Sequence, residues 1–125
     1  MTAATLPLVL EQGISYSKVW NLRDSAGNPY DLTGYTARLQ VRESYAAAAA
    51  ILDLTTENGG LILGGALGTL EIVITEADFD AITVPDTPGT PPTLKAVYDL
   101  ELVTGVTVIR LFQGPCTISR EVTRG

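Results

Sequence analysis

The segment Tyr35–Arg42, YTARLQVR, carries the clearest structural pattern in the chain. Its apolar side chains at positions 35, 37, 39 and 41 alternate with polar or charged ones at positions 36, 38, 40 and 42. Successive side chains of a β-strand point to opposite faces, so this alternation predicts a strand with one buried and one solvated face. A second segment, Leu94–Val103 (LKAVYDLELV), repeats the pattern and directs Lys95, Asp99 and Glu101 toward solvent.

Six further segments, separated by turn residues, are rich in the β-branched and aromatic residues that strands favour. They are Leu8–Gln12, Ile14–Arg23, Ile51–Thr55, Thr69–Ile74, Val106–Gln113 and Cys116–Val122. Glycine-rich turns such as Glu57–Gly60 and Gly64–Gly68 lie between them and favour antiparallel hairpins. Seven or eight short strands at this spacing predict an all-β fold, an antiparallel β-sandwich.

Three segments depart from the strand pattern. Thr75–Asp78 resembles a capping box, so Thr75–Ala81 is expected to form the one short helix. The five alanines Ala46–Ala50 favour a helix but are too few to hold one, which predicts a mobile connection with at most one helical turn. Four prolines place Val84–Thr93 in an extended loop outside any sheet.

The composition excludes several classes of function. The chain has 8 Lys and Arg against 14 Asp and Glu, a net charge of −6, which disfavours binding to nucleic acid phosphates or anionic membranes. It contains no His, so it lacks the usual proton carrier of hydrolases and the commonest zinc ligand. We therefore expect a protein that is not an enzyme and that uses no cofactor or metal.

The length of 125 residues fits a single domain. We place the β-sandwich at residues 7–125 and a flexible N-terminal arm at residues 1–6. The first 17 residues contain no Lys or Arg, and no apolar run reaches the roughly 18 residues that span a bilayer, so we expect neither a signal peptide nor a membrane helix.

Two groups of carboxylates are candidates for chemistry. Asp99 and Glu101 lie two residues apart on one predicted strand, within the spacing of acid/base pairs, although a solvated sheet face explains them more simply. Asp78, Asp80 and Asp86 could offer oxygen ligands to calcium, but Asp in the first turn of a helix is the more common role.

Two single residues could have either a structural or a functional role. Cys116 is the only cysteine and no histidine is present to activate it, so a small buried core residue is expected rather than a nucleophile. Trp20, beside Tyr16 and Leu22 in the alternation, is expected to anchor the core between the sheets rather than to form a ligand platform.

The segment Asp24–Arg42, DSAGNPYDLTGYTARLQVR, resembles the small immunoglobulin-like β-sandwich proteins of tailed bacteriophages. The resemblance extends along nearly the whole chain through five further segments: Glu57–Gly60, Gly68–Leu70, Tyr98–Leu102, Arg110–Leu111 and Val122–Arg124. Similar modules occur as the N-terminal domain of phage baseplate upper proteins. The resemblance implies an immunoglobulin-like fold and a non-enzymatic part of the virion that docks on the tail or on another capsid component.

These observations predict a structural virion protein of the tail, neck or baseplate, made in the bacterial host cytoplasm. Its expected partners are other virion proteins and copies of itself. The alternatives are a head decoration or cement protein and, in another class, a carbohydrate-binding or calcium-dependent adhesion module. Exposed apolar or proline-rich connections are natural docking surfaces. The predicted subunit contacts are therefore Ala46, Ala47, Ala48, Ala49, Ala50, Pro85, Pro88, Pro91 and Pro92.

Overall fold

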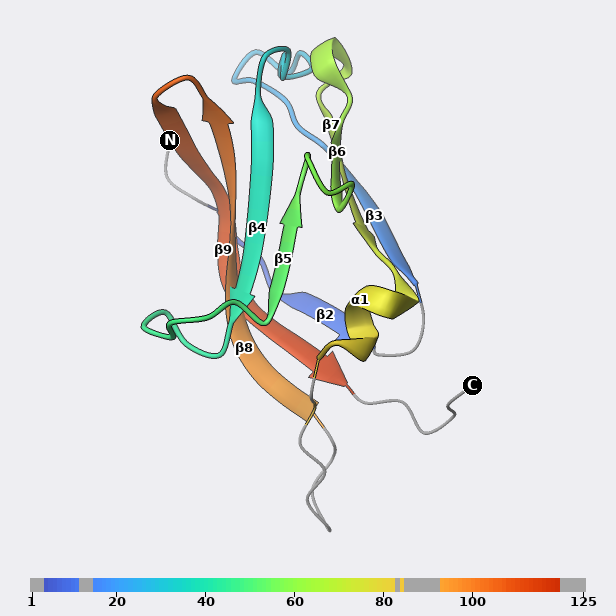
Figure 1. Ribbon diagram of the computed structural model, residues 1–125. Coiled ribbons are helices and arrows are strands. Elements are labelled where there is room, and N and C mark those ends of the chain that lie inside the picture. The colour runs from blue at the N-terminus through green and yellow to red at the C-terminus, as the bar shows by residue number, and fades with distance from the viewer. Residues whose placement is uncertain (1–3, 12–14, 83, 85–92, 120–125) are drawn as a thin grey trace.

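A computed structural model describes residues 4–11, 15–82, 84 and 93–119 of the chain (Figure 1). The described part is an all-β sandwich of two sheets, which confirms the predicted fold class. Its nine strands are β1 (Ala4–Thr5), β2 (Leu8–Glu11), β3 (Tyr16–Asn21), β4 (Thr36–Arg42), β5 (Leu52–Thr55), β6 (Leu61–Leu63), β7 (Thr69–Ile74), β8 (Thr93–Thr104) and β9 (Thr107–Ser119). No helix in these residues is long and apolar enough to cross a membrane.

The larger sheet has the strand order β1-β9-β8-β4-β5, and β2 also pairs with β9. The smaller sheet has the order β3-β7-β6. The chain alternates between the two sheets instead of completing one before the other, as in an immunoglobulin-type sandwich. Figure 1 shows the two sheets facing each other. One side is formed by β4, β5, β8 and β9, and the other by β3, β6 and β7.

The core lies between the sheets and is built from the alternating apolar residues. On β4 the buried side chains are Ala37, Leu39 and Val41, and Leu39 pairs with Leu54 of β5 and with Leu100 of β8. The opposing sheet contributes the buried side chains Leu70, Ile72 and Ile74 from β7. Burying these side chains provides the main driving force for folding.

The short helix forms where it was predicted. It spans Glu76–Asp80 (α1), and the Thr75 side chain accepts a hydrogen bond from the backbone N–H of Asp78 while the Asp78 side chain accepts one from the Thr75 N–H. This capping box satisfies donors that a helix end otherwise leaves unpaired. Phe79 on α1 is buried, and α1 lies at the lower end of the sandwich in the view of Figure 1. A 3-10 turn spans Gly65–Leu67 (η1).

The C-terminal strands differ from the prediction. The segments Val106–Gln113 and Cys116–Val122 were expected to be separate strands, and Gly114 and Pro115 lie between them. The structure joins them in the continuous β9, which ends at Ser119 in the described part. Pro115 has no N–H to donate, and it lies where the neighbour of β9 changes from β1 to β2, so the ladder tolerates it there.

The N-terminal residues also differ from the prediction. Ala4 and Thr5 were assigned to a flexible arm, but they form β1, which runs parallel to β9 of the same chain, and the Leu6 N–H donates to the Gln113 carbonyl at 2.9 Å. The pairing of β1 and β2 with β9 is parallel, so the sandwich is not purely antiparallel. Parallel neighbours need a long connection, and nearly the whole chain separates these strands.

Two further details were not predicted. The strand β6 was missed because its three residues, between glycine-rich turns, are too few to show an alternation. Trp20 contacts the core but is only partly buried, because β3 lies at the edge of its sheet. Its ring lies 5.0 Å from that of Phe112 on β9. The predicted anchor between the sheets is thus a packing residue at the rim of the core.

Candidate functional site

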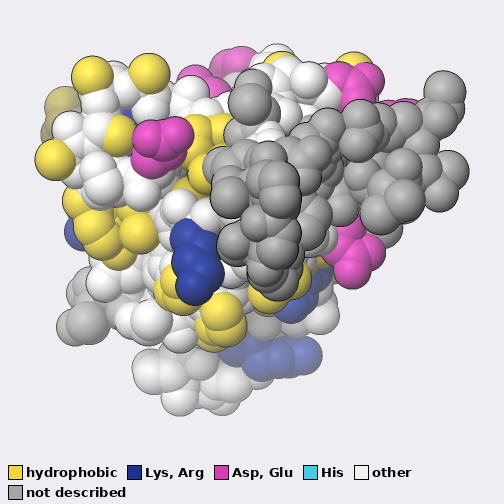
Figure 2. Space-filling model, turned by 90° about the horizontal axis from the view of Figure 1, so that it is seen from below, with side chains coloured by type: hydrophobic (Ala, Val, Ile, Leu, Met, Phe, Trp, Pro, Cys, Tyr) yellow, Lys and Arg dark blue, Asp and Glu magenta, His cyan; other side chains and the backbone are white. Residues whose placement is uncertain are grey.

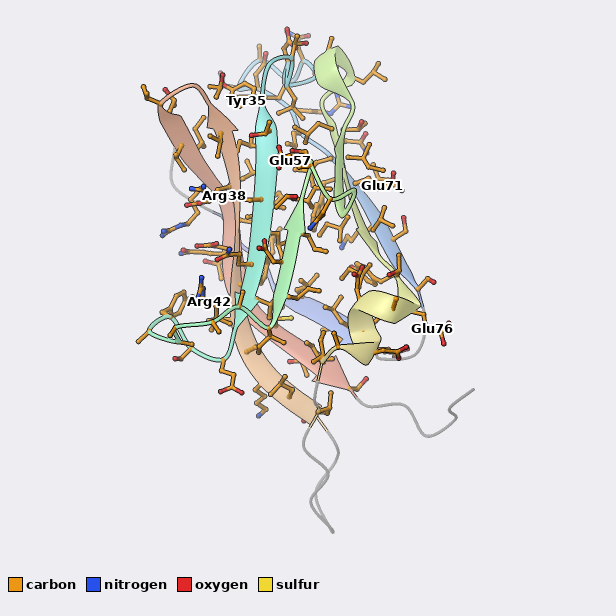
Figure 3. All side chains as sticks on the ribbon, in the orientation of Figure 1. Tyr35, Arg38, Arg42, Glu57, Glu71 and Glu76 are labelled. Atoms are coloured by element: carbon orange, nitrogen blue, oxygen red, sulfur yellow. The ribbon has the colours of Figure 1, made fainter. Side chains whose placement is uncertain are left out.

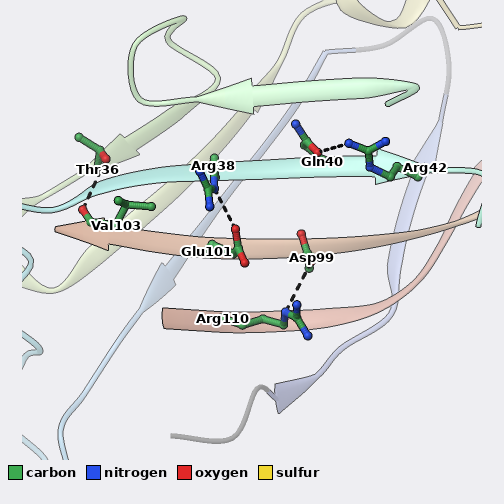
Figure 4. Close-up of polar contacts among 8 residues, drawn as sticks. All are labelled: Thr36, Arg38, Gln40, Arg42, Asp99, Glu101, Val103 and Arg110. Atoms are coloured by element: carbon green, nitrogen blue, oxygen red, sulfur yellow. Dashed lines mark hydrogen bonds and ion pairs between the residues drawn. The ribbon is translucent and has the colours of Figure 1, made fainter. Parts of the chain in front are cut away.

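A hollow of about 400 Å³ opens on the outer face of the larger sheet, over β4, β8 and β9. We call it the arginine hollow because three of the eight Lys and Arg residues of this acidic chain line it. Its lining residues are Arg38, Gln40, Arg42, Tyr45, Val97, Tyr98, Asp99, Glu101 and Arg110. Figure 4 shows that the charged residues come from three adjacent strands.

Strand periodicity and register bring these side chains together. The outward positions of β4 are occupied by Arg38, Gln40 and Arg42, while Ala37, Leu39 and Val41 of the same strand enter the core. On β8, Glu101 lies opposite Arg38 and Asp99 lies opposite Gln40. The Arg38 Nε donates to Glu101 Oε1 at 2.8 Å.

A β-bulge positions the third arginine. The pairing of β8 with β9 shifts between Leu100 and Glu101, so Leu100 pairs with Phe112 whereas Glu101 pairs with Arg110. The extra residue, Leu111, is buried along with Phe112. Bulges are a common means of redirecting a side chain beside a site. The shift leaves Arg110 on the outer face, where its Nε lies 3.5 Å from Asp99 Oδ2.

Arg42 differs from the other two arginines in its partners. It donates from Nη2 to Gln40 Oε1 at 2.7 Å and from Nη1 to the Ala47 carbonyl at 2.9 Å, and both acceptors are neutral. Among the described residues, no carboxylate lies within ion-pair distance of Arg42. Its positive charge is therefore available for an acidic group brought by a partner.

The electrostatics of Asp99 reflect this crowded surface. Burial of the carboxyl raises its pKa, and the neighbouring Glu101 raises it further, while Arg110, Arg38 and Arg42 act in the opposite direction. The three arginines outnumber the two carboxylates by one, so the hollow carries an excess positive charge on a chain with net charge −6. Planar guanidinium groups suit recognition of carboxylates through paired hydrogen bonds.

The alanine connection borders this hollow. Ala46–Ala50 forms turns and bends rather than a helix, with the Ala47 N–H donating to the Ser44 carbonyl at 3.1 Å. Tyr45, at its start, is 69% exposed and lines the hollow. Figure 2 views the molecule from below and shows hydrophobic side chains gathered on the side where this connection projects. The structure thus joins part of the predicted contact set to a charged surface.

The remaining candidates lie elsewhere. Cys116 is buried, as predicted, and burial raises the pKa of its thiol to about 12. Asp78 has the predicted role at the start of α1. Asp86 and the four prolines Pro85, Pro88, Pro91 and Pro92 lie outside the described residues. Within the described part, no group of three or more acidic, Cys or His side chains is arranged to hold a metal ion.

The sequence indicated the components of the arginine hollow but not the hollow itself. The alternation already placed Arg38 and Arg42 on one face and Asp99 and Glu101 on another strand's solvated face. Their pairing depends on the β4/β8 register, and the place of Arg110 depends on the bulge. Tyr45 carried no recognisable signal, because it lies in a connection without periodicity.

No protein-family model matches this chain, and a search of curated proteins found no match. The resemblance to phage proteins therefore rests on the sequence segments quoted above.

Proposed function

We propose that the protein is a non-enzymatic structural component of a tailed-bacteriophage particle, of the tail, neck or baseplate. It docks in several copies through protein-protein contacts. The docking surface comprises the arginine hollow and the adjoining connection Ala46–Ala50. The observation that carries the proposal is the hydrogen bond from Arg42 Nη1 to the Ala47 carbonyl, which makes the predicted contact segment and the charged hollow one continuous surface.

The chemistry of this surface suits a protein partner. Tyrosine and arginine are enriched at the energetically important centres of protein interfaces, and the surface presents Tyr45 beside three arginines. Arg42 is already held by two hydrogen bonds, so ordering its side chain on binding costs less conformational entropy. The small alanine side chains allow a partner's backbone to approach closely.

The reactive groups of the chain support a non-enzymatic role. The chain contains no histidine, and its only thiol is buried with a raised pKa. Asp99 and Glu101 each lie beside an arginine on an open sheet face. An open sheet face does not exclude water as the pocket of a general acid does.

The test is incorporation into particles. Ala46–Ala50 is replaced by a Gly-Ser segment of equal length, and the copies per particle are counted by quantitative mass spectrometry. We expect a folded protein with reduced occupancy, because surface connections tolerate such changes while the contact surface is lost. The control is Val106→Ser, at the fully exposed tip of the β8/β9 hairpin, which should leave occupancy unchanged.

Full occupancy of the Gly-Ser variant would refute this docking surface. The copy number of the wild-type protein separates the two virion roles. A small multiple fits a tail, neck or baseplate part, whereas a number that follows the capsid lattice fits a head decoration protein.

A further inference from the structure

Charge is distributed unevenly over the two sheets. Arg38 and Arg42 lie on the outer side of the larger sheet, whereas Glu71 and Glu76 lie on the opposite side of the molecule (Figure 3). On the outer positions of the smaller sheet, Glu71 is the only charged residue among the described strands β3, β6 and β7. The arginine hollow thus has one excess positive charge, whereas the outer face of the smaller sheet has one negative charge.

The outer face of the smaller sheet also exposes apolar side chains. Val19 of β3, Glu71 of β7 and Ile62 of β6 lie side by side in register. Val19 and Ile62 are each 49% exposed, so they present apolar surface to solvent on either side of Glu71. We call these three residues the β3-β7-β6 row.

Glu71 is available for a contact. Its Oε2 accepts a hydrogen bond from Ser17 Oγ at 2.8 Å, which orients the carboxylate on the outer face. No Lys or Arg in the described part lies within ion-pair distance of it. Lys18, its nearest basic neighbour on β3, is turned to the other side of the strand, with Nζ 5.6 Å from the centre of the Trp20 ring.

We propose that the arginine hollow of one copy binds the β3-β7-β6 row of a second copy, with Glu71 facing Arg42 and with Val19 and Ile62 packing near Tyr45. This inference rests on the proposed function and names the partner as another copy of the chain. Arg42, which has no carboxylate partner in the described part of the chain, would gain one, and exposed apolar groups on both faces would leave water. The hollow offers the guanidinium of Arg42, and the row offers the carboxylate of Glu71.

The contact joins two different faces, so it is heterologous. Each copy keeps one free hollow and one free row, and further copies can add at both. Contacts of this kind close into rings or continue as stacks, depending on the rotation between neighbours. Such an assembly fits a protein that is present in several copies around a symmetric particle.

Charge reversal tests the contact directly. The full chain and the variants Arg42→Glu and Glu71→Arg are studied separately and as an equimolar mixture by sedimentation velocity over a range of concentrations. The wild-type protein should associate. Each variant alone should associate about tenfold or more weakly, because like charges then face each other across the contact.

The mixture of the two variants is the decisive sample. Every contact between unlike copies in it pairs opposite charges, either the two wild-type groups or the two introduced ones, so association should return. Arg23→Glu and Glu57→Arg make the same changes in net charge at exposed positions outside both faces, and they should associate like the wild type. Circular dichroism and thermal melting verify that each variant is folded.

Three results would overturn this inference: a wild-type protein that stays monomeric, variants that associate like the wild type, or a mixture that fails to regain association. A monomeric wild type combined with reduced particle occupancy of Arg42→Glu would assign the hollow to a different virion protein. The proposed function would then stand without self-association. Full occupancy of the Gly-Ser variant would instead refute the proposed docking surface.

Discussion

The Tyr98→Phe substitution tests how the N-terminal segment is held on the sandwich. Tyr98 is 2% exposed, and its hydroxyl donates to the Leu6 carbonyl at 2.8 Å. Leu6 lies between β1 and β2, directly against Gly114 of β9, where an added Cβ would come within 2.5 Å of the Leu6 carbonyl oxygen. The hydroxyl thus helps to hold Leu6 in its close position against Gly114 of β9.

The expected cost follows from the geometry. Phe keeps the ring and its burial, so only the hydrogen bond is lost and the Leu6 carbonyl loses this donor. Such a loss costs about 1 to 2 kcal/mol. With an unfolding entropy of about 2.1 cal/mol/K per residue, each kcal/mol lowers the Tm of a chain of this length by roughly 4 °C.

The assays are urea unfolding and amide hydrogen exchange. In the Tyr98→Phe protein, the free energy of unfolding should fall by about 1 to 2 kcal/mol. The Leu6 N–H, which donates to the Gln113 carbonyl, should exchange faster than in the wild type, by more than any change at the amides of β4. Tyr45→Phe is the matched control and should change neither quantity, because that side chain is 69% exposed. A Tyr98→Phe protein as stable as the wild type, with unchanged exchange at Leu6, would refute the reasoning.

Three further predictions concern other parts of the fold. Thr75→Ala removes the cap of α1 and should lower the unfolding free energy by about 1 kcal/mol in urea unfolding; no loss would mean that the capping box contributes nothing. Trp20→Ala should cost about 2 to 3 kcal/mol, below the 3 to 5 typical of fully buried aromatic residues, and a larger loss would show that Trp20 anchors the core after all. Because the pKa of Asp99 is raised in the folded state, its contribution to stability is fully present below the unfolded value of 3.8 and is lost as the pH rises through the folded value. Asp99→Asn should therefore gain stability relative to the wild type between acidic and neutral pH, and a pH-independent difference in melting temperature would contradict this.

The alternation of apolar and polar residues was sufficient to predict the class of fold. Segments such as Thr36–Arg42 and Thr93–Thr104 bury every second side chain, a local pattern that is visible in any window of a few residues. The capping box at Thr75 is local in the same sense, since donor and acceptor are three residues apart. For these features the sequence needed no knowledge of distant partners.

The prediction was wrong where distant segments decide the structure. No local pattern around Gly114 and Pro115 shows that β9 continues through them. The strand continues because the N-terminal segment passes over Gly114 at Leu6 and pairs with β9 on both sides, first through β1 and then through β2. The partial exposure of Trp20 likewise follows from the edge position of β3. These features depend on which strands become neighbours.

The sequence by itself determined the strand pattern, the short helix, the buried thiol and the outward direction of the charged residues, because each follows from local periodicity or composition. Only the tertiary structure decided that Arg38 pairs with Glu101, that Arg110 reaches Asp99 and that Arg42 has no carboxylate partner among the described residues. The physical reason is that strand register and bulges are set by the packing of residues far apart in the chain. A shift of one residue would turn these side chains to the opposite face.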